Sequence, residues 1–219
     1  MSENPESRTA LLPVDFDPFG EPSAAAFELT EPQRELLAVT QMGDAANCAY
    51  NQVFALRLRG ALSQQSLHNA LAQVVQRHEA LRLRIDVEAE RQQTLPSIAV
   101  ALPLVDLRDV DPARRDATII ELLDRETRTP FDLNTAPLWR AQLVREGADL
   151  HRFIFTAHHV IADGWSSAVI LGDLARAYAA DRFGLPARQP EPASYRKFVA
   201  EGRTEAAIEE VGEIGRAHV

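Results

Sequence analysis

The stretch from Ala157 to Ser166 constrains the fold of this chain most, because it marks a junction between a strand and a helix. It reads AHHVIADGWS and follows an aromatic and β-branched run at 153–156, which predicts a buried strand. Beyond it, apolar residues recur at helical spacing, at Ile170, Leu174, Ala177 and Tyr178. The two adjacent histidines therefore lie where a strand ends and a turn begins, a place where rigid scaffolds often carry reactive groups.

The chemistry of the histidine pair favours a catalytic site over a buried structural histidine. A neutral imidazole can take a proton from an incoming nucleophile and return it. Because side chains alternate along a strand, His158 and His159 should point in opposite directions, and one of them can face a cavity. We expect Asp163 to pair with a cation, and Gly164 to adopt a backbone geometry that other residues resist. No Cys, His or Glu follows at zinc-ligand spacing, so no metal site is predicted.

Composition narrows the classes of partner. A net charge of −9 and a pI near 5.2 argue against nucleic acid. The single cysteine, Cys48, excludes an internal disulfide and fits a reducing compartment. No apolar run reaches membrane-spanning length, and the N-terminus lacks a signal-peptide core. We therefore expect a cytoplasmic protein with neither nucleic-acid nor membrane partners.

The pattern of predicted elements indicates an α+β fold, since strands and helices mix without strict βαβ alternation. Residues 1–26 are rich in Pro, Ser, Glu and Ala, and predict a flexible leader or interdomain linker. Helices are expected to begin after caps at Thr30, Ser63 and Asp111. Strands are expected at 50–59, 82–87 and 97–103, with a hairpin formed by 138–145 and 152–157.

Five stretches resemble motifs of one family. His158 to Gly164 resembles the HHxxxDG signature of condensation domains of nonribosomal peptide synthetases, which belong to the chloramphenicol-acetyltransferase-like superfamily. Four more stretches resemble other motifs of that family, in the family's order: LTxxQR at 29–34, LRGxL at 58–62, RHExLR at 77–82 and PFDLxxxPLxR at 130–140. Together the five matches are far more specific than the histidine signature alone.

The resemblance implies a two-lobed protein with its active site in a tunnel between the lobes. Residues 27–185 would form the N-terminal lobe, a mixed sheet flanked by helices, and 186–212 a linker and helix toward a missing second lobe. Residues 213–219 are similar to the translation of a common sequencing-adapter read, so we expect this tail to be non-native. The truncated chain alone is then expected to be inactive.

The resemblance also implies amide-bond formation between carrier-bound substrates. His159 would act as general base or stabilise the tetrahedral intermediate, while His158 would orient the turn. The partners would be upstream and downstream carrier proteins and an adenylation domain. No cofactor would be bound directly, because the substrates arrive on phosphopantetheine arms of the carriers.

Three further residues take roles from the same resemblance. Asp163 would be structural, in an ion pair for which Arg82 is the candidate partner. Gly164 would let the phosphopantetheine-borne substrate approach closely. Trp165 is expected to pack locally and to help shape the tunnel.

Other functions remain open from the sequence. O-acyl transfer, as in wax-ester or polyketide-associated acyltransferases, needs the same histidine but activates a hydroxyl group. Epimerisation domains share much of the pattern. A non-catalytic carrier-protein docking remnant is the third class, although the intact HHxxxDG argues against decay.

Overall fold

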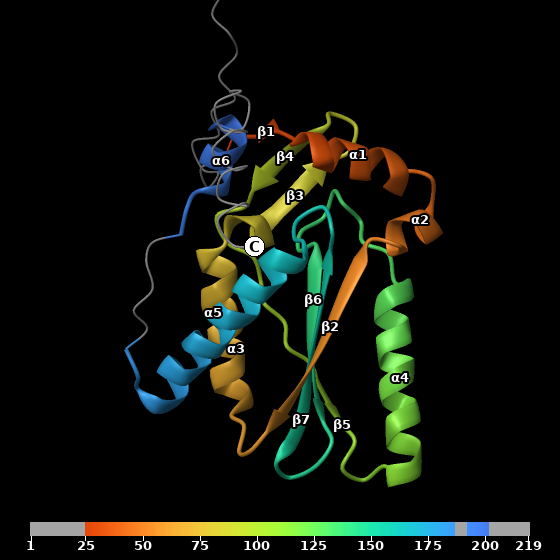
Figure 1. Cartoon of the computed structure of the whole chain (residues 1–219), viewed down its shortest axis with the longest axis vertical. Helices are drawn as coiled ribbons and strands as arrows, with labels where there is room; N and C mark the ends of the chain where they lie inside the picture. The colour runs from red at the N-terminus through yellow and green to blue at the C-terminus, as the bar shows by residue number, and fades with distance from the viewer. Residues whose placement is uncertain (1–24, 187–191, 202–219) are drawn as a thin grey trace, which may run out of the picture.

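The computed structural model describes residues 25–186 and 192–201, which form two β-sheets with helices packed around them (Figure 1). The first sheet is antiparallel, in the order β1-β4-β3. The second has the order β2-β7-β6-β5, and only its β5–β6 pair is parallel. The strands are β1 (Phe27–Glu28), β2 (Asn51–Arg59), β3 (Leu83–Asp86), β4 (Arg91–Thr94), β5 (Leu104–Asp106), β6 (Trp139–Arg145) and β7 (Leu150–His158). This mixed sheet with flanking helices confirms the predicted α+β class.

The helices begin where the sequence supplies capping side chains. Thr30, Ser63, Asp111 and Asp163 each accept a backbone N–H of the following first turn. Gly184, with φ of +65°, ends the longest helix in the left-handed conformation that glycine tolerates. The helices are α1 (Glu31–Thr40), α2 (Asp44–Cys48), α3 (Gln64–Arg77), α4 (Pro112–Arg128), α5 (Gly164–Phe183) and α6 (Tyr195–Glu201), with a short 3₁₀ helix at Glu79–Arg82.

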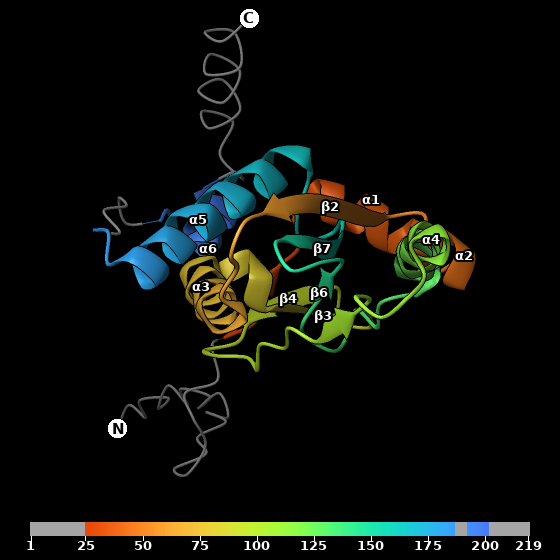
Figure 2. The same ribbon diagram turned by 90° about the horizontal axis from the view of Figure 1, so that it is seen from below.

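The larger sheet separates two apolar clusters. On one face, Phe153, Phe155 and Ala157 of β7 pack in the main core, which α3 and α5 also line (Figures 1 and 2). On the other face, Ile154 packs in a smaller cluster with residues of α4. Because side chains alternate along a strand, His158 falls on the α4 face of the sheet.

Two of the expected strands differ in the structure. Residues 97–103 form no strand; Ile98 and Val100 pack against the core from an irregular segment, and β4 and β5 lie on either side of it. The strand expected at 82–87 begins only at Leu83, because the 3₁₀ turn takes up Arg82. The predicted leader up to residue 24, part of the linker (187–191) and everything after 201, including the 213–219 tail, lie outside the described residues.

Candidate active site

Backbone hydrogen bonds anchor the histidine pair at the end of β7. The amide of His158 donates to the carbonyl of Leu138 at 3.0 Å, and the amide of His159 donates to that of Tyr50 at 2.9 Å. Ile161 donates back to the carbonyl of His158 at 3.1 Å and closes a tight turn. The pair is therefore held by the residue just before β2, by the residue just before β6, and by its own turn.

One ring nitrogen of His159 is assigned by its contact. Nδ1 lies 3.1 Å from the carbonyl oxygen of Ala162, and a carbonyl oxygen can only accept. In the neutral ring, Nδ1 therefore carries the proton and Nε2 keeps its lone pair. The ring is half-buried, and within residues 25–186 and 192–201 Nε2 makes no hydrogen bond. This is the protonation pattern that a general base requires.

His158 is in a different environment, since its side chain is 0 % exposed. Its Nδ1 accepts the amide proton of Val160 at 3.2 Å, so Nδ1 is unprotonated. Burial lowers the pKa of His158 to about 4, against a smaller opposite effect from the backbone of Asn47. The rings of Tyr50 and Phe131 lie 6.3 Å and 6.1 Å from it. The ring is neutral at physiological pH and has no access to solvent, which suits an orienting role better than proton transfer.

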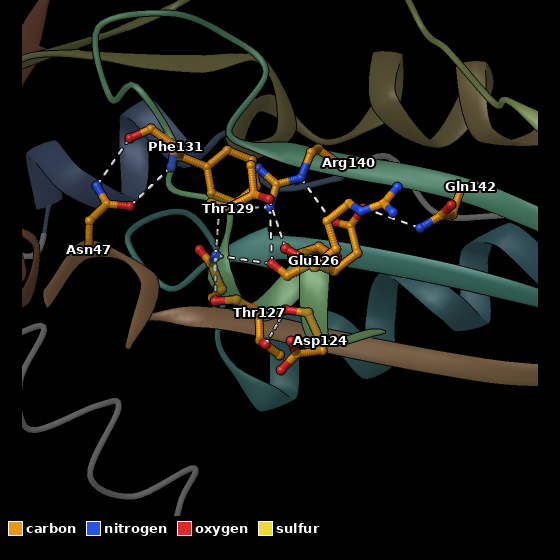
Figure 3. Close-up of polar contacts among 11 residues, drawn as sticks. Asn47, Asp124, Glu126, Thr127, Thr129, Phe131, Arg140 and Gln142 are labelled. Atoms are coloured by element: carbon orange, nitrogen blue, oxygen red, sulfur yellow. Dashed lines mark hydrogen bonds and ion pairs between the residues drawn. The ribbon is translucent and has the colours of Figure 1, made fainter. Parts of the chain in front are cut away.

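A polar network joins the end of α4 to the sheet beside His158 (Figure 3). At its centre the carboxylate of Glu126 accepts from Arg140 at 2.9 Å, Gln142 at 3.2 Å and Thr156 at 2.9 Å. The side-chain amide of Asn51 donates to carbonyl groups at the end of α4, including that of Thr129 at 2.8 Å. The C-terminal end of α4 is thus fixed to three strands by side chains.

Phe131 connects this network to His158. The guanidinium of Arg140 lies over the Phe131 ring, 3.9 Å from its centre (Figure 3). The Phe131 ring in turn meets the His158 ring edge-on. The side-chain amide of Asn47 bonds the backbone of Phe131 twice. It donates from Nδ2 to the Phe131 carbonyl and accepts from the Phe131 amide at Oδ1, each at 3.0 Å. The network therefore fixes the aromatic wall that covers His158.

Asp163 caps α5 and forms no ion pair with any described residue. Its Oδ1 accepts from the amide and the hydroxyl of Ser166, both at 2.7 Å. These bonds, with a smaller contribution from nearby His159, lower the pKa of Asp163. The predicted ion pair with Arg82 was wrong. The carboxylate instead accepts a hydrogen bond at the N-terminus of α5, where backbone N–H groups lack intrahelical partners.

Arg82 is buried, and its side chain donates hydrogen bonds to backbone carbonyl groups. Its guanidinium donates to the carbonyls of Val75, Gln76, Leu95 and Pro96, at 2.6 to 3.3 Å. Burial is also the main reason that its pKa is lowered. The side chain therefore joins the end of α3 to the segment after β4.

The structure corrects two further expectations about the turn. Gly164 does not have a positive φ, and a Cβ placed there would meet nothing within 4 Å, so glycine is not required by the backbone. Trp165 does not pack locally, because 81 % of it is exposed. The other tryptophan, Trp139, is buried and donates from Nε1 to the carbonyl of Leu81 at 2.9 Å.

Sequence reasoning missed several residues that build the site. Tyr50 lies beside both histidine rings, at 6.3 Å and 6.4 Å. Asn47 braces Phe131, and Gln33 donates to the carbonyl of Val160 at 3.0 Å. Gln33 was recognised only as part of the LTxxQR motif, which suggested no contact with the turn.

The described residues show neither a metal-binding cluster nor a membrane-spanning helix. No cluster of three or more His, Cys, Asp or Glu side chains in residues 25–186 and 192–201 could hold a metal ion. None of the helices there combines the length and the apolar character that crossing a bilayer requires.

Comparisons with known proteins agree on one family. The sequence model of the condensation domain matches residues 24–211. Chondramide synthase cmdD of Chondromyces crocatus is 36 % identical over 173 residues, which are 78 % of this chain and 4 % of that protein.

Two solved structures share the fold. The starter condensation domain of rhizomide synthetase superposes with a TM-score of 0.74 at 21 % identity, covering 82 % of this chain and 43 % of that one. The SgcC5 protein of Streptomyces globisporus superposes with a TM-score of 0.71 at 36 % identity, covering 83 % and 42 %. The chain spans less than half the length of these neighbours, and the fold is that of a chloramphenicol-acetyltransferase-like lobe. The chain belongs to the condensation-domain family of nonribosomal peptide synthetases.

Proposed function

We propose that this chain forms one part of a site that makes amide bonds between carrier-bound substrates. The donor would be an acyl or peptidyl thioester, and the nucleophile the α-amine of an aminoacyl thioester. One observation carries the proposal: the 3.1 Å contact between Nδ1 of His159 and the carbonyl of Ala162, which leaves Nε2 unprotonated on a half-buried ring.

The chemistry needs a base at the moment of attack. The amine nitrogen forms a bond to the thioester carbon while Nε2 of His159 takes the proton that the nitrogen loses. Collapse of the tetrahedral intermediate breaks the carbon–sulfur bond, and the proton passes to the departing thiolate. His158 stays neutral throughout and keeps the turn in shape through its bond to Val160. Asp163 holds the start of α5 in place.

The substrates and partners follow from the family. The thioesters would arrive on phosphopantetheine arms of an upstream and a downstream carrier domain, with an adenylation domain in the same assembly. A second lobe would complete the tunnel. Gly164, with open space where a side chain would be, and exposed Trp165 would border the path of the arm.

Transfer of the acyl group to a hydroxyl is the second candidate function. The SgcC5 protein, 36 % identical to this chain, has been solved in complex with (R)-(-)-1-(2-naphthyl)-1,2-ethanediol, a vicinal diol. A base with a free Nε2 serves a hydroxyl nucleophile as well as an amine.

The test replaces the aligned part of the SgcC5 protein with this chain, so that a complete domain is assayed. The graft receives a carrier loaded with an acyl thioester, and either an aminoacyl carrier or a diol as the acceptor. Amide product on the downstream carrier, seen by mass spectrometry of the intact carrier, supports condensation. Ester product with the diol and no amide would favour O-acyl transfer. A folded graft that makes neither product would contradict both functions.

A further inference from the structure

One buried amide reaches the histidine turn from a distant part of the chain. Nε2 of Gln33, in the first turn of α1, donates to the carbonyl of Val160 at 3.0 Å. The two residues are 127 positions apart, and both are buried, at 4 % and 3 % exposure. In the described part of the chain, the backbone of 159–162 is bonded by the side chains of His158 and His159 within the turn, and by that of Gln33 from far away in the sequence.

The orientation of the Gln33 amide is fixed on all sides. The carbonyl of Val160 can only accept, so the NH₂ group must face it. The other proton of Nε2 goes to Oε1 of Gln92 at 3.0 Å, while Nε2 of Gln92 returns a bond to Oε1 of Gln33 at 2.9 Å. Gln92 is 1 % exposed, and its second proton goes to the carbonyl of Glu28 at 2.9 Å. The backbone amide of Thr30 donates to Oε1 of Gln33 at 2.9 Å.

The peptide between Val160 and Ile161 is thereby held at both ends. Its carbonyl accepts from Gln33, and its N–H donates to the carbonyl of His158 at 3.1 Å. The Ala162 carbonyl, which accepts from Nδ1 of His159, lies two peptides further along the turn. Rotation of the Val160–Ile161 peptide would move the short piece of chain that leads to this carbonyl, and the carbonyl decides which nitrogen of His159 carries the proton.

We propose that Gln33 is a positioning residue for His159, acting through the Val160 carbonyl to keep the Ala162 carbonyl within reach of Nδ1. The inference rests on the proposed role of His159 as base. It assigns to the start of α1 a part in setting the active tautomer, although this helix carries no reacting group.

Gln92 offers a matched control, because it belongs to the same buried amide pair but does not touch the turn. Gln33→Met and Gln92→Met each remove one amide and keep an unbranched side chain of similar length. Both should destabilise the fold, since each leaves buried polar partners unsatisfied. Only Gln33→Met removes the donor to Val160. If Gln33→Met does not fold, the double variant Gln33→Met with Gln92→Met replaces it, because removing both partners of a buried pair is less disruptive than removing one.

The tautomer of His159 is read from two-bond ¹H–¹⁵N spectra of the ¹⁵N-labelled 219-residue chain, with the signals assigned by a His159→Ala variant. In the wild type the Nδ1–H form should predominate. In Gln33→Met its ratio to the Nε2–H form should fall about five-fold, the population change expected for loss of one ordinary hydrogen bond. Gln92→Met should keep the wild-type ratio at a similar loss of stability.

Two results would overturn the inference: an unchanged ratio in Gln33→Met, or an equal fall in Gln92→Met. The readout needs no turnover, so it separates this inference from the proposed function. In the grafted domain, Gln33→Met should also lower kcat by about ten- to hundred-fold with little change in KM, because small misplacements of a base are costly. If His159→Ala keeps its rate while Gln33→Met still shifts the tautomer, the proposed function fails and the positioning role stands.

Discussion

Acidification should destabilise this chain through His158, which is buried in its neutral form. The ring is 0 % exposed, and burial lowers its pKa to about 4, whereas in the unfolded chain it titrates near 6.5. As the pH falls, the unfolded chain therefore binds the proton first, and stability drops between these two values. One pKa unit corresponds to about 1.4 kcal/mol, so the free energy of unfolding should fall by about 2.5 kcal/mol between pH 7.5 and 4.5.

The assay is urea unfolding at pH 7.5, 6, 5 and 4.5, followed by the fluorescence of buried Trp139. His158→Asn is the matched variant, because its amide oxygen can accept the Val160 proton without titrating. The pKa of His151 is also lowered, mainly by burial. Because the variant keeps His151, the difference between variant and wild type reports His158 alone. Asp163, whose pKa is lowered by its bonds to Ser166, loses its stabilising effect as the pH falls from the ordinary aspartate pKa through this lower value, and both proteins share that loss. A wild type and a variant with the same pH dependence would refute the assigned burial and neutrality of His158.

Substitutions at three residues test the contacts that fix the site, each by urea unfolding at pH 7.5. Arg82→Lys should lower the free energy of unfolding by about 2 kcal/mol, because one ammonium cannot reach all the carbonyls that the guanidinium joins; no change would contradict those bonds. Asp163→Ala should cost about 1 kcal/mol as a lost cap and Asp163→Asn only a few tenths; an equal loss in both would indicate a charge-dependent partner instead. Glu126→Gln should cost about 3 kcal/mol, because it leaves Arg140 without its counter-ion; a loss below about 0.5 kcal/mol would show that the network is loose.

Local signals in the sequence predicted the local structure well. Caps at Thr30, Ser63 and Asp111 mark true helix starts, and the hairpin of β6 and β7 lies where turn residues separate two apolar runs. The histidine turn was placed correctly because a buried strand and an apolar helix flank it. These features depend on neighbours within a few residues, so they can be predicted from the local sequence.

Two of the misses were decided by partners that are distant in the sequence. Residues 97–103 alternate like a strand, but the carbonyl of Val100 meets the ring of His68 at 3.0 Å instead of a neighbouring strand. The polar β4 was overlooked because Gln92 looks solvent-exposed until Gln33 covers it. Arg82 and Asp163 were paired by motif, but Arg82 donates to the carbonyl of Leu95, and Asp163 accepts from the amide of Ser166 three residues further on.

The most direct measurement is the single-turnover rate of amide formation by the grafted domain with His159→Ala, at saturating donor and acceptor carriers. A parallel unfolding curve shows that the variant is folded, and Gln92→Met serves as a control outside the turn. If Nε2 of His159 is the base, the rate should fall by about 10²- to 10⁴-fold. A folded variant within a few-fold of the wild-type rate would contradict the assignment of His159 and, with it, the proposed mechanism.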